Sequence, residues 1–190
     1  MLKDLIKKNR SYRRFNENKK ISQEELVELV ELARLSPSGS NLQPLKYYLS
    51  YEADNNSQVF STLRWAGYLK DWDGPESGER PSGYIIMLGD SRIARKFGVD
   101  PGIAAQSIML GAAEKGMGGC IIGNVDRDRL RTTLNIPAQY EILYVLALGY
   151  PVEQVQIEEV GPEGRIKYWR DSEQVHHVPK RSIAELIISD

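Results

Sequence analysis

DPGIAAQSIMLGAAEKGMGGCIIGNV, from Asp100 to Val125, joins a helix pattern directly to a strand pattern. Asp100 and Pro101 are typical of an N-cap followed by proline at the first helical position. The helix that they open is small and apolar around most of its circumference, so it is expected to be buried on several sides, in a core or a subunit contact. Gly118 to Val125 has the pattern of a buried strand with its exit turn.

Outward from this stretch, helix and strand patterns alternate irregularly. Ser22 and Glu25 form a capping box for a helix that ends near Ser36-Pro37. Further helices are expected at residues 2–9, at 126–134 and from Ser182, and strands at 46–51, 83–89 and 142–151. Residues 65–81 are expected to begin helical and end as a loop. Hydrophobic continuity predicts one domain, residues 1–190, with a central sheet covered on both faces.

The composition excludes several classes of protein. Hydrophobic residues make up 41% and charged residues 27%, which is typical of a soluble globular chain. No apolar run approaches the ~20 residues that a membrane helix needs, and the basic N-terminus lacks a secretory apolar stretch. The single cysteine, Cys120, cannot form an internal disulfide and lies in an apolar strand pattern, so it is expected to be a core residue. These features predict a cytoplasmic protein without a membrane partner.

The charge distribution is uneven. The first 20 residues carry eight cations and two carboxylates, a local charge of +6, whereas the whole chain has a net charge of -1. A basic start is typical of a nucleic-acid arm, a transit peptide or an anionic-ligand site. Because the rest of the chain is acidic, no nucleic-acid partner is expected, and only a steep salt dependence of DNA binding would revive that reading.

Several common sites are missing from the sequence. There is no phosphate-binding P-loop and no G-x-S-x-G nucleophile elbow. The glycines between Gly116 and Gly119 precede a strand, whereas a dinucleotide fingerprint follows one. His176 and His177 are the only histidines, and adjacent residues rarely converge on one metal, so no metal site is expected.

Arginine and lysine are concentrated near both ends of the chain. Arg10, Arg13 and Arg14 lie in RSYRRF, and Lys180 and Arg181 lie in HVPKRS. A planar guanidinium can hold two phosphate oxygens at once. Dispersed surface charge is the ordinary explanation for each residue alone. It weakens only if the two ends of the chain meet in space.

Five blocks together resemble the FMN-dependent nitroreductase family: RSYRRF, SPSGSNLQP, GIAAQSIMLGAAEKGMGGCIIG, ALGYP and HVPKRS, in this order. The resemblance runs from about Leu2 to Leu186. It implies an α+β fold with a central, mostly antiparallel sheet flanked by helices. It also implies an intertwined homodimer with FMN at the subunit interface, contacted by both chains.

The resemblance assigns roles to particular residues. The FMN phosphate and ribityl end would be held by Arg10, Ser11, Arg13 and Arg14, with added charge from Lys180 and Arg181. The second subunit would line the isoalloxazine with Pro37, Ser38, Gly39, Ser40 and Asn41, and the Gly123-Asn124 turn would offer backbone N–H groups near the flavin N5 or O4. The acceptor is expected near Trp65, Tyr68 and Trp72. No catalytic acid or base is expected, because FMN itself performs the redox chemistry.

The implied function is an oxidoreductase that passes reducing equivalents from NAD(P)H to a small organic acceptor, such as a nitroaromatic or a quinone, with ping-pong kinetics. Two alternatives keep the flavin. In one, the reaction is dehalogenation or fragmentation of flavin with oxygen. In the other, the protein is a flavin-binding or redox-sensing module without turnover.

Overall fold

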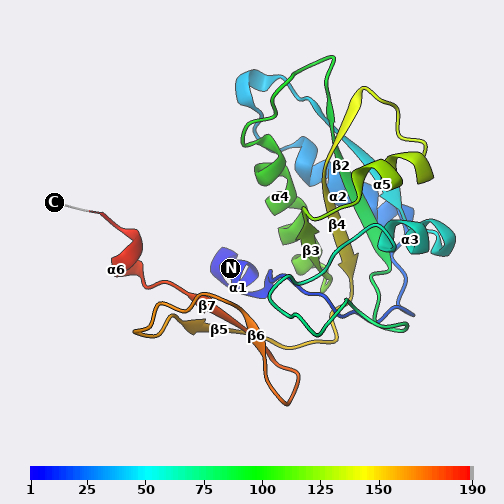
Figure 1. The fold of residues 1–190 in the computed structure, drawn as a ribbon. Coiled ribbons are helices and arrows are strands. Elements are labelled where there is room, and N and C mark those ends of the chain that lie inside the picture. The colour runs from blue at the N-terminus through cyan, green and yellow to red at the C-terminus, as the bar shows by residue number, and fades with distance from the viewer. Residues whose placement is uncertain (189–190) are drawn as a thin grey trace.

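The computed structural model describes residues 1–188, and Figure 1 shows the arrangement of the elements. The helices are α1 (Leu2–Lys8), α2 (Gln23–Arg34), α3 (Ala53–Phe60), α4 (Asp100–Glu114), α5 (Arg127–Thr133) and α6 (Ile183–Leu186), with a single 3₁₀ turn, η1 (Gly39–Asn41). The strands are β1 (Leu45–Ser50), β2 (Gly83–Asp90), β3 (Gly118–Ile122), β4 (Tyr140–Gly149), β5 (Val155–Glu159), β6 (Trp169–Arg170) and β7 (His176–Lys180).

Four strands form the central sheet, in the order β1-β2-β4-β3. Every neighbouring pair in it is antiparallel. All eight residues of β2 are buried, as expected for an inner strand covered on both faces. The α+β architecture with an antiparallel sheet is therefore confirmed.

Helices cover both faces of this sheet, as the sequence predicted. On one face, Leu26 and Leu29 of α2 and Ile108 of α4 pack against Ile85 and Leu146. The other face packs against the region of α3 and α5, represented by Val59 and Leu130. Figure 1 shows the sheet between these two layers. The capping box of α2 is present, with both Ser22 and Glu25 making their hydrogen bonds.

Helix α4 and strand β3 are largely buried in the core. Nine of the 15 residues of α4 are buried, while Ile103 and Gln106 remain exposed on its outer side. Gly119 of β3 lets two backbones approach, because an added Cβ would contact the carbonyl oxygen of Ala147. The sequence correctly predicted that both elements are buried.

A second, smaller sheet follows the central one and was not predicted. Its order is β5-β7-β6, with β5 and β7 parallel and β6 and β7 antiparallel. It lies below the main body beside the N-terminal segment, and α6 extends away from it (Figure 1). Helix α6 begins with the expected cap at Ser182 but is one turn long and has no buried residue. Among residues 1–188, no helix is long and apolar enough to cross a membrane.

Two local predictions were wrong. The helix α4 begins at Asp100, and its N-cap is Val99, because the Asp100 carboxylate accepts hydrogen bonds from a distant loop instead. Residues 65–81 contain turns and no helix, whereas the helix in this part of the chain is α3, at Ala53–Phe60. The wide spacing of Gly67, Gly74 and Gly78 suits turns, and Gly74 and Gly78 have positive φ.

Candidate functional site

The two ends of the chain meet beside β3. Ser11 forms a parallel bridge with Gly119, and the Tyr12 N–H donates to the Gly119 carbonyl over 2.9 Å. Strand β7 brings its side chains to the same place. The N-terminal segment, α4, β3 and β7 together line a cavity of about 280 Å³. Its lining residues are Asn9, Arg10, Ser11, Arg13, Gln106, Met109, Ile121, Tyr168, His176, Val178 and Lys180. The condition set by the sequence, that Arg10 and Lys180 share one pocket, is met.

Arg13 is the most constrained cation in this cavity. The residue is 8% exposed, and its Nη1 donates to the Ser11 carbonyl and to His176 Nε2, each over 3.1 Å. Its guanidinium carbon lies 4.8 Å from the centroid of the Tyr168 ring. The nearby Cys120 thiol has a pKa raised by burial, an effect that the positive charge of Arg13 opposes.

A buried ion pair lies behind Arg13. Glu153 accepts hydrogen bonds from the backbone N–H groups of Arg13 and Arg14, and from Arg170 Nη2 over 3.1 Å. The side chains of Arg170 and Glu153 are almost fully buried. Since one carboxylate compensates two buried guanidinium groups, Arg13 and Arg170, the cluster keeps one unbalanced positive charge. Buried charge is costly unless paired, so this arrangement favours an anion in the cavity.

His176 adds no charge to this balance. Burial, together with the nearby Arg13 and Arg170, lowers the pKa of His176 to about 4. The ring is therefore neutral at physiological pH, and the unbalanced positive charge comes from the guanidinium groups.

Arg10 and Lys180 complete the cationic lining. Arg10 Nη2 donates to the Ile6 carbonyl over 2.7 Å, while its buried Nε has no hydrogen-bond partner within the described chain. A buried N–H group without a partner, on a residue that lines the cavity, is suited to donate a hydrogen bond to a bound anion. A terminal phosphate carries nearly two negative charges, which the guanidinium and ammonium groups of Arg10, Arg13 and Lys180 can neutralise. The residues present thus fit the phosphate and ribityl end of FMN.

Two predicted phosphate ligands do not line this cavity. Arg14 Nε and Nη2 both donate to the Glu79 carboxylate over 2.6 Å, and the pKa of Glu79 is lowered by that contact. Arg181 is exposed and pairs with Glu185 over 3.2 Å. Each neighbours a cavity residue in sequence, and because consecutive residues of an extended segment point to opposite sides, Arg14 and Arg181 point elsewhere.

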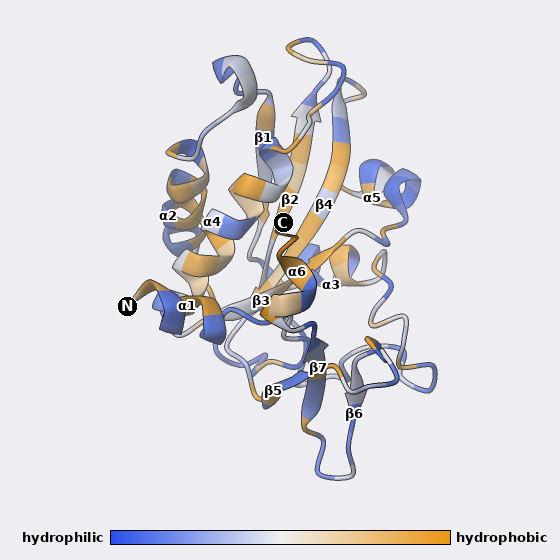
Figure 2. Cartoon of the chain, turned by 90° about the vertical axis from the view of Figure 1, so that its left-hand side faces the viewer, coloured by the Kyte–Doolittle hydropathy of each residue, from blue (hydrophilic) through white to orange (hydrophobic). Residues whose placement is uncertain are grey.

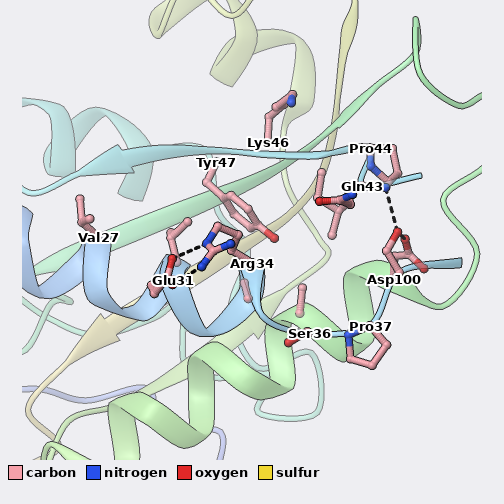
Figure 3. Close-up of a pocket in the computed structure, with 15 residues that line it drawn as sticks. Val27, Glu31, Arg34, Ser36, Pro37, Gln43, Pro44, Lys46, Tyr47 and Asp100 are labelled. Carbon is pink, nitrogen blue, oxygen red and sulfur yellow. Dashed lines mark hydrogen bonds and ion pairs between the residues drawn. The ribbon is translucent and has the colours of Figure 1, made fainter. Parts of the chain in front are cut away.

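The loop predicted to line the isoalloxazine lies elsewhere on the same chain. Pro37 and Ser38 border a second cavity, of about 380 Å³, between α2, β1 and the start of α4 (Figure 3). The Asp100 carboxylate accepts from Ser38 Oγ over 2.6 Å and from the Gly39 N–H over 2.9 Å. Within this chain, the loop and the cationic cavity do not share a pocket. The predicted contact of the loop with the flavin of a second subunit stays a prediction.

Gly123 and Asn124 follow the end of β3, where the sequence predicted its exit turn, and both are exposed. The Asn124 carbonyl accepts from the Arg64 N–H over 3.0 Å, and the Gly123 carbonyl accepts from Arg127 Nη2 over 3.1 Å. These contacts hold the turn through its carbonyl groups. Its predicted role as a donor to the flavin stays a prediction.

The three aromatic residues proposed for the acceptor have different environments. Trp65 is 8% exposed and belongs to the core, so it does not face a ligand. Trp72 is partly buried beneath the Arg170 guanidinium. Tyr68 is 49% exposed, and its ring lies 4.9 Å from that of Tyr168, a cavity residue. Of the three, Tyr68 is therefore the most accessible to an acceptor.

Sequence reasoning missed Glu153, Tyr168 and His176. If residues 176–180 are taken as a strand, every second side chain points to the same side, and this spacing would have grouped His176 with Lys180. In the structure His176, Val178 and Lys180 of β7 all line the cavity. Glu153 and Tyr168 gave no such signal, since their partners are distant in sequence. Within the described residues, no group of three or more metal-binding side chains converges.

Several named proteins are similar to this chain over most of their length. The Bacillus subtilis protein YodC, named as an NAD(P)H nitroreductase, is 24% identical to this chain. The 196 aligned residues cover 87% of this chain and 97% of YodC. The iodotyrosine deiodinase of Thermotoga neapolitana is 25% identical, over 80% of this chain and 89% of that protein. A structure from Exiguobacterium sibiricum, assigned as a nitroreductase in complex with FMN, superposes with a TM-score of 0.67 at 18% identity, covering 80% of this chain and 89% of that one.

The model of the nitroreductase family matches residues 6–150. This span begins just before the cationic segment at Arg10, includes the Pro37–Asn41 loop and helix α4, and ends after β4, so it contains most of the fold described above. Because the family model matches well over half of the chain, the chain belongs to the nitroreductase family.

Proposed function

We propose that this protein is an FMN-dependent oxidoreductase that transfers reducing equivalents from NAD(P)H to a small organic acceptor, such as a nitroaromatic or a quinone. The observation that carries the proposal is the cavity in which Arg10, Ser11 and Arg13 from the N-terminus meet Lys180 from β7. Membership of the nitroreductase family and the FMN-bound relative support the same cofactor.

In this proposal the chain's own residues bind and orient the cofactor. Arg10, Arg13 and Lys180 hold the phosphate, and Ser11 contacts the ribityl end. FMN, when bound, supplies the redox chemistry. The Gly123-Asn124 turn lies at the exposed end of β3, beyond Ile121 in the cavity wall, where its backbone can contact the ring system. Neither Arg14 nor Arg181 has a phosphate contact in this account.

The active form in this proposal is a homodimer. Helix α6 extends from the body (Figure 1), and its Ile183 and Leu186 and the following Ile187 are exposed. Figure 2 shows hydrophobic colour in the segment of α6. Exposed contiguous apolar residues mark association surfaces. In the homodimer that we propose, the ring system would extend from the cationic cavity toward the Pro37–Asn41 loop of a second subunit. Cys120 is the single cysteine and is buried, which suits a reducing compartment such as the cytoplasm.

The proposal is tested by purifying the protein and measuring bound cofactor. The protein should be yellow, release FMN on denaturation, and be reduced by NADH or NADPH in stopped-flow absorbance. Initial rates with a nitroaromatic or quinone acceptor should give the parallel double-reciprocal lines of a ping-pong mechanism. A colourless protein with no affinity for added FMN would overturn the assignment. Bound FMN that neither nucleotide reduces would instead identify a sensing module.

Reductive dehalogenation is a second candidate reaction at the same site. It is favoured by the similarity to an iodotyrosine deiodinase over most of both chains. Product analysis separates the candidates: the chemically reduced holoprotein is mixed with iodotyrosine or with a nitroaromatic, and released iodide is compared with the reduced nitro product.

A further inference from the structure

We propose that His176 is a positioning residue that fixes the Arg13 guanidinium in the orientation required for phosphate binding. The inference rests on the proposed function for the identity of the anion, while the contact between the two side chains is a property of the chain itself. His176 is not one of the residues that the sequence motifs assign to the cofactor. It would act on the phosphate through Arg13.

The first observation is how the guanidinium is held. Nη1 of Arg13 donates both to the Ser11 carbonyl and to His176 Nε2, and the plane is supported by the Tyr168 ring. Both of these hydrogen bonds come from Nη1, and the Cys120 thiol also lies close to the guanidinium. The remaining N–H groups of Arg13, a residue that lines the cavity, are the ones that this proposal assigns to the phosphate. A guanidinium can present two such N–H groups to one phosphate.

The second observation concerns the tautomer of His176. A guanidinium has donors and no acceptor, so the ring nitrogen that faces Arg13 must be unprotonated. The ring proton is then on Nδ1, which is buried and has no partner among residues 1–188. A neutral ring is also what burial and the two nearby guanidinium groups of Arg13 and Arg170 favour.

The third observation is that the backbone of His176 is held on both sides by the small sheet. His176 lies on β7, the middle strand of the small sheet, and pairs with Val155 on one side and Arg170 on the other. The backbone N–H of His176 donates to the Gln154 carbonyl over 2.9 Å, and the centroid of its ring lies 5.1 Å from that of the Tyr168 ring. Holding Arg13 in advance reduces the conformational entropy lost when the anion binds. The small sheet therefore has a functional role as the support of the phosphate site.

Two substitutions separate positioning from simple packing. Glutamine can place its amide oxygen near the position of Nε2, whereas leucine fills space without an acceptor. We expect His176→Leu to weaken FMN binding by about 10- to 100-fold, the effect of losing one hydrogen bond to a charged group. His176→Gln should bind FMN nearly as the wild type does, and riboflavin, which lacks the phosphate, should bind equally to all three proteins. FMN affinity unchanged in His176→Leu, or FMN and riboflavin affinities reduced equally, would overturn the proposal.

A second measurement does not depend on the flavin. The chain has only two histidines, so ¹⁵N-imidazole NMR of the full-length protein gives two sets of ring signals, and the spectrum of His176→Leu assigns them. At pH 7 the His176 ring should be neutral with its proton on Nδ1. A proton on Nε2 would exclude the contact with Arg13 and end the proposal, whether or not FMN binds. An Nδ1–H ring in a protein that binds no FMN would refute the proposed function and leave the positioning of Arg13 in place.

Discussion

Asp100 illustrates how one buried carboxylate can hold a loop in an unusual conformation. The loop contains three non-glycine residues with positive φ: Ser40 at 50°, Asn41 at 54° and Gln43 at 51°. Such conformations cost on the order of 1 kcal/mol or more each and persist when neighbouring groups enforce them. Asp100 supplies two acceptors at the start of α4, and Ser38 Oγ in turn accepts from the Gln43 N–H over 2.9 Å.

Replacement of Asp100 should therefore loosen the loop. We expect Asp100→Ala to lower the free energy of unfolding by about 1–3 kcal/mol and to speed hydrogen exchange of the amides in residues 38–43. Asp100→Asn keeps one acceptor and should have a smaller effect. Asp54→Ala, which removes an exposed carboxylate from the first turn of α3, is the matched control and should leave the exchange of residues 38–43 unchanged. Equal exchange in Asp100→Ala and the wild type would contradict the account.

The cavity residues that the sequence predicted were found through the family resemblance of short motifs. Arg10, Ser11, Arg13 and Lys180 belong to short motifs, and the structure brings them to one cavity. Asp100 was assigned as a cap because Asp-Pro is typical of a helix start. Its true partners lie more than 60 residues away, and no local pattern indicates them.

At the scale of elements, predictability follows burial. Helix α2 and strands β2 and β4 pack against the core, so their apolar periodicity is strong, and the sequence located them. Strands β5, β6 and β7 are short and partly exposed, and β5 pairs in parallel with β7, which follows it in the chain only after β6. A polar alternation in five residues is too weak to distinguish such strands from a loop.

The small sheet should be sensitive to pH through His177. Its ring contacts Glu158 over 3.1 Å and Asp171 over 3.0 Å, and stacks on Trp169. The hydrogen bond with Asp171, followed by that with Glu158, raises the pKa of His177. The stabilisation is fully present below the ordinary histidine pKa of about 6.5 and is lost as the pH rises through the raised value.

Hydrogen exchange of β5 and β7, corrected for intrinsic rates, should accordingly increase as the pH is raised above about 6.5. His177→Gln should remove this pH dependence, while the central sheet should respond to neither change. Persistence of the same pH profile in His177→Gln would show that another group controls the small sheet.

At the scale of the whole molecule, α6 extends from the body, and none of its residues is buried within residues 1–188. Its residues Ile183 and Leu186 are 70% and 62% exposed. The wild type should sediment as a dimer, and the double variant Ile183→Asp/Leu186→Asp should shift toward monomer, because the buried apolar contact is replaced by charge. Ile166→Asp, at another exposed apolar position, is the control and should remain dimeric. A monomeric wild type, or a double variant as dimeric as the control, would contradict this role of α6.

The central claim is that cations from both ends of the chain bind the phosphate of one FMN molecule. It is tested most directly by titrating the protein with FMN and with riboflavin, which differ only in that phosphate. The wild type should bind FMN far more tightly, and Arg10→Ala/Lys180→Ala should lose most of this difference while keeping its affinity for riboflavin. The matched variant Arg14→Ala/Arg181→Ala removes two cations outside the cavity and should keep the preference for FMN. An undiminished preference for FMN in Arg10→Ala/Lys180→Ala would contradict the account.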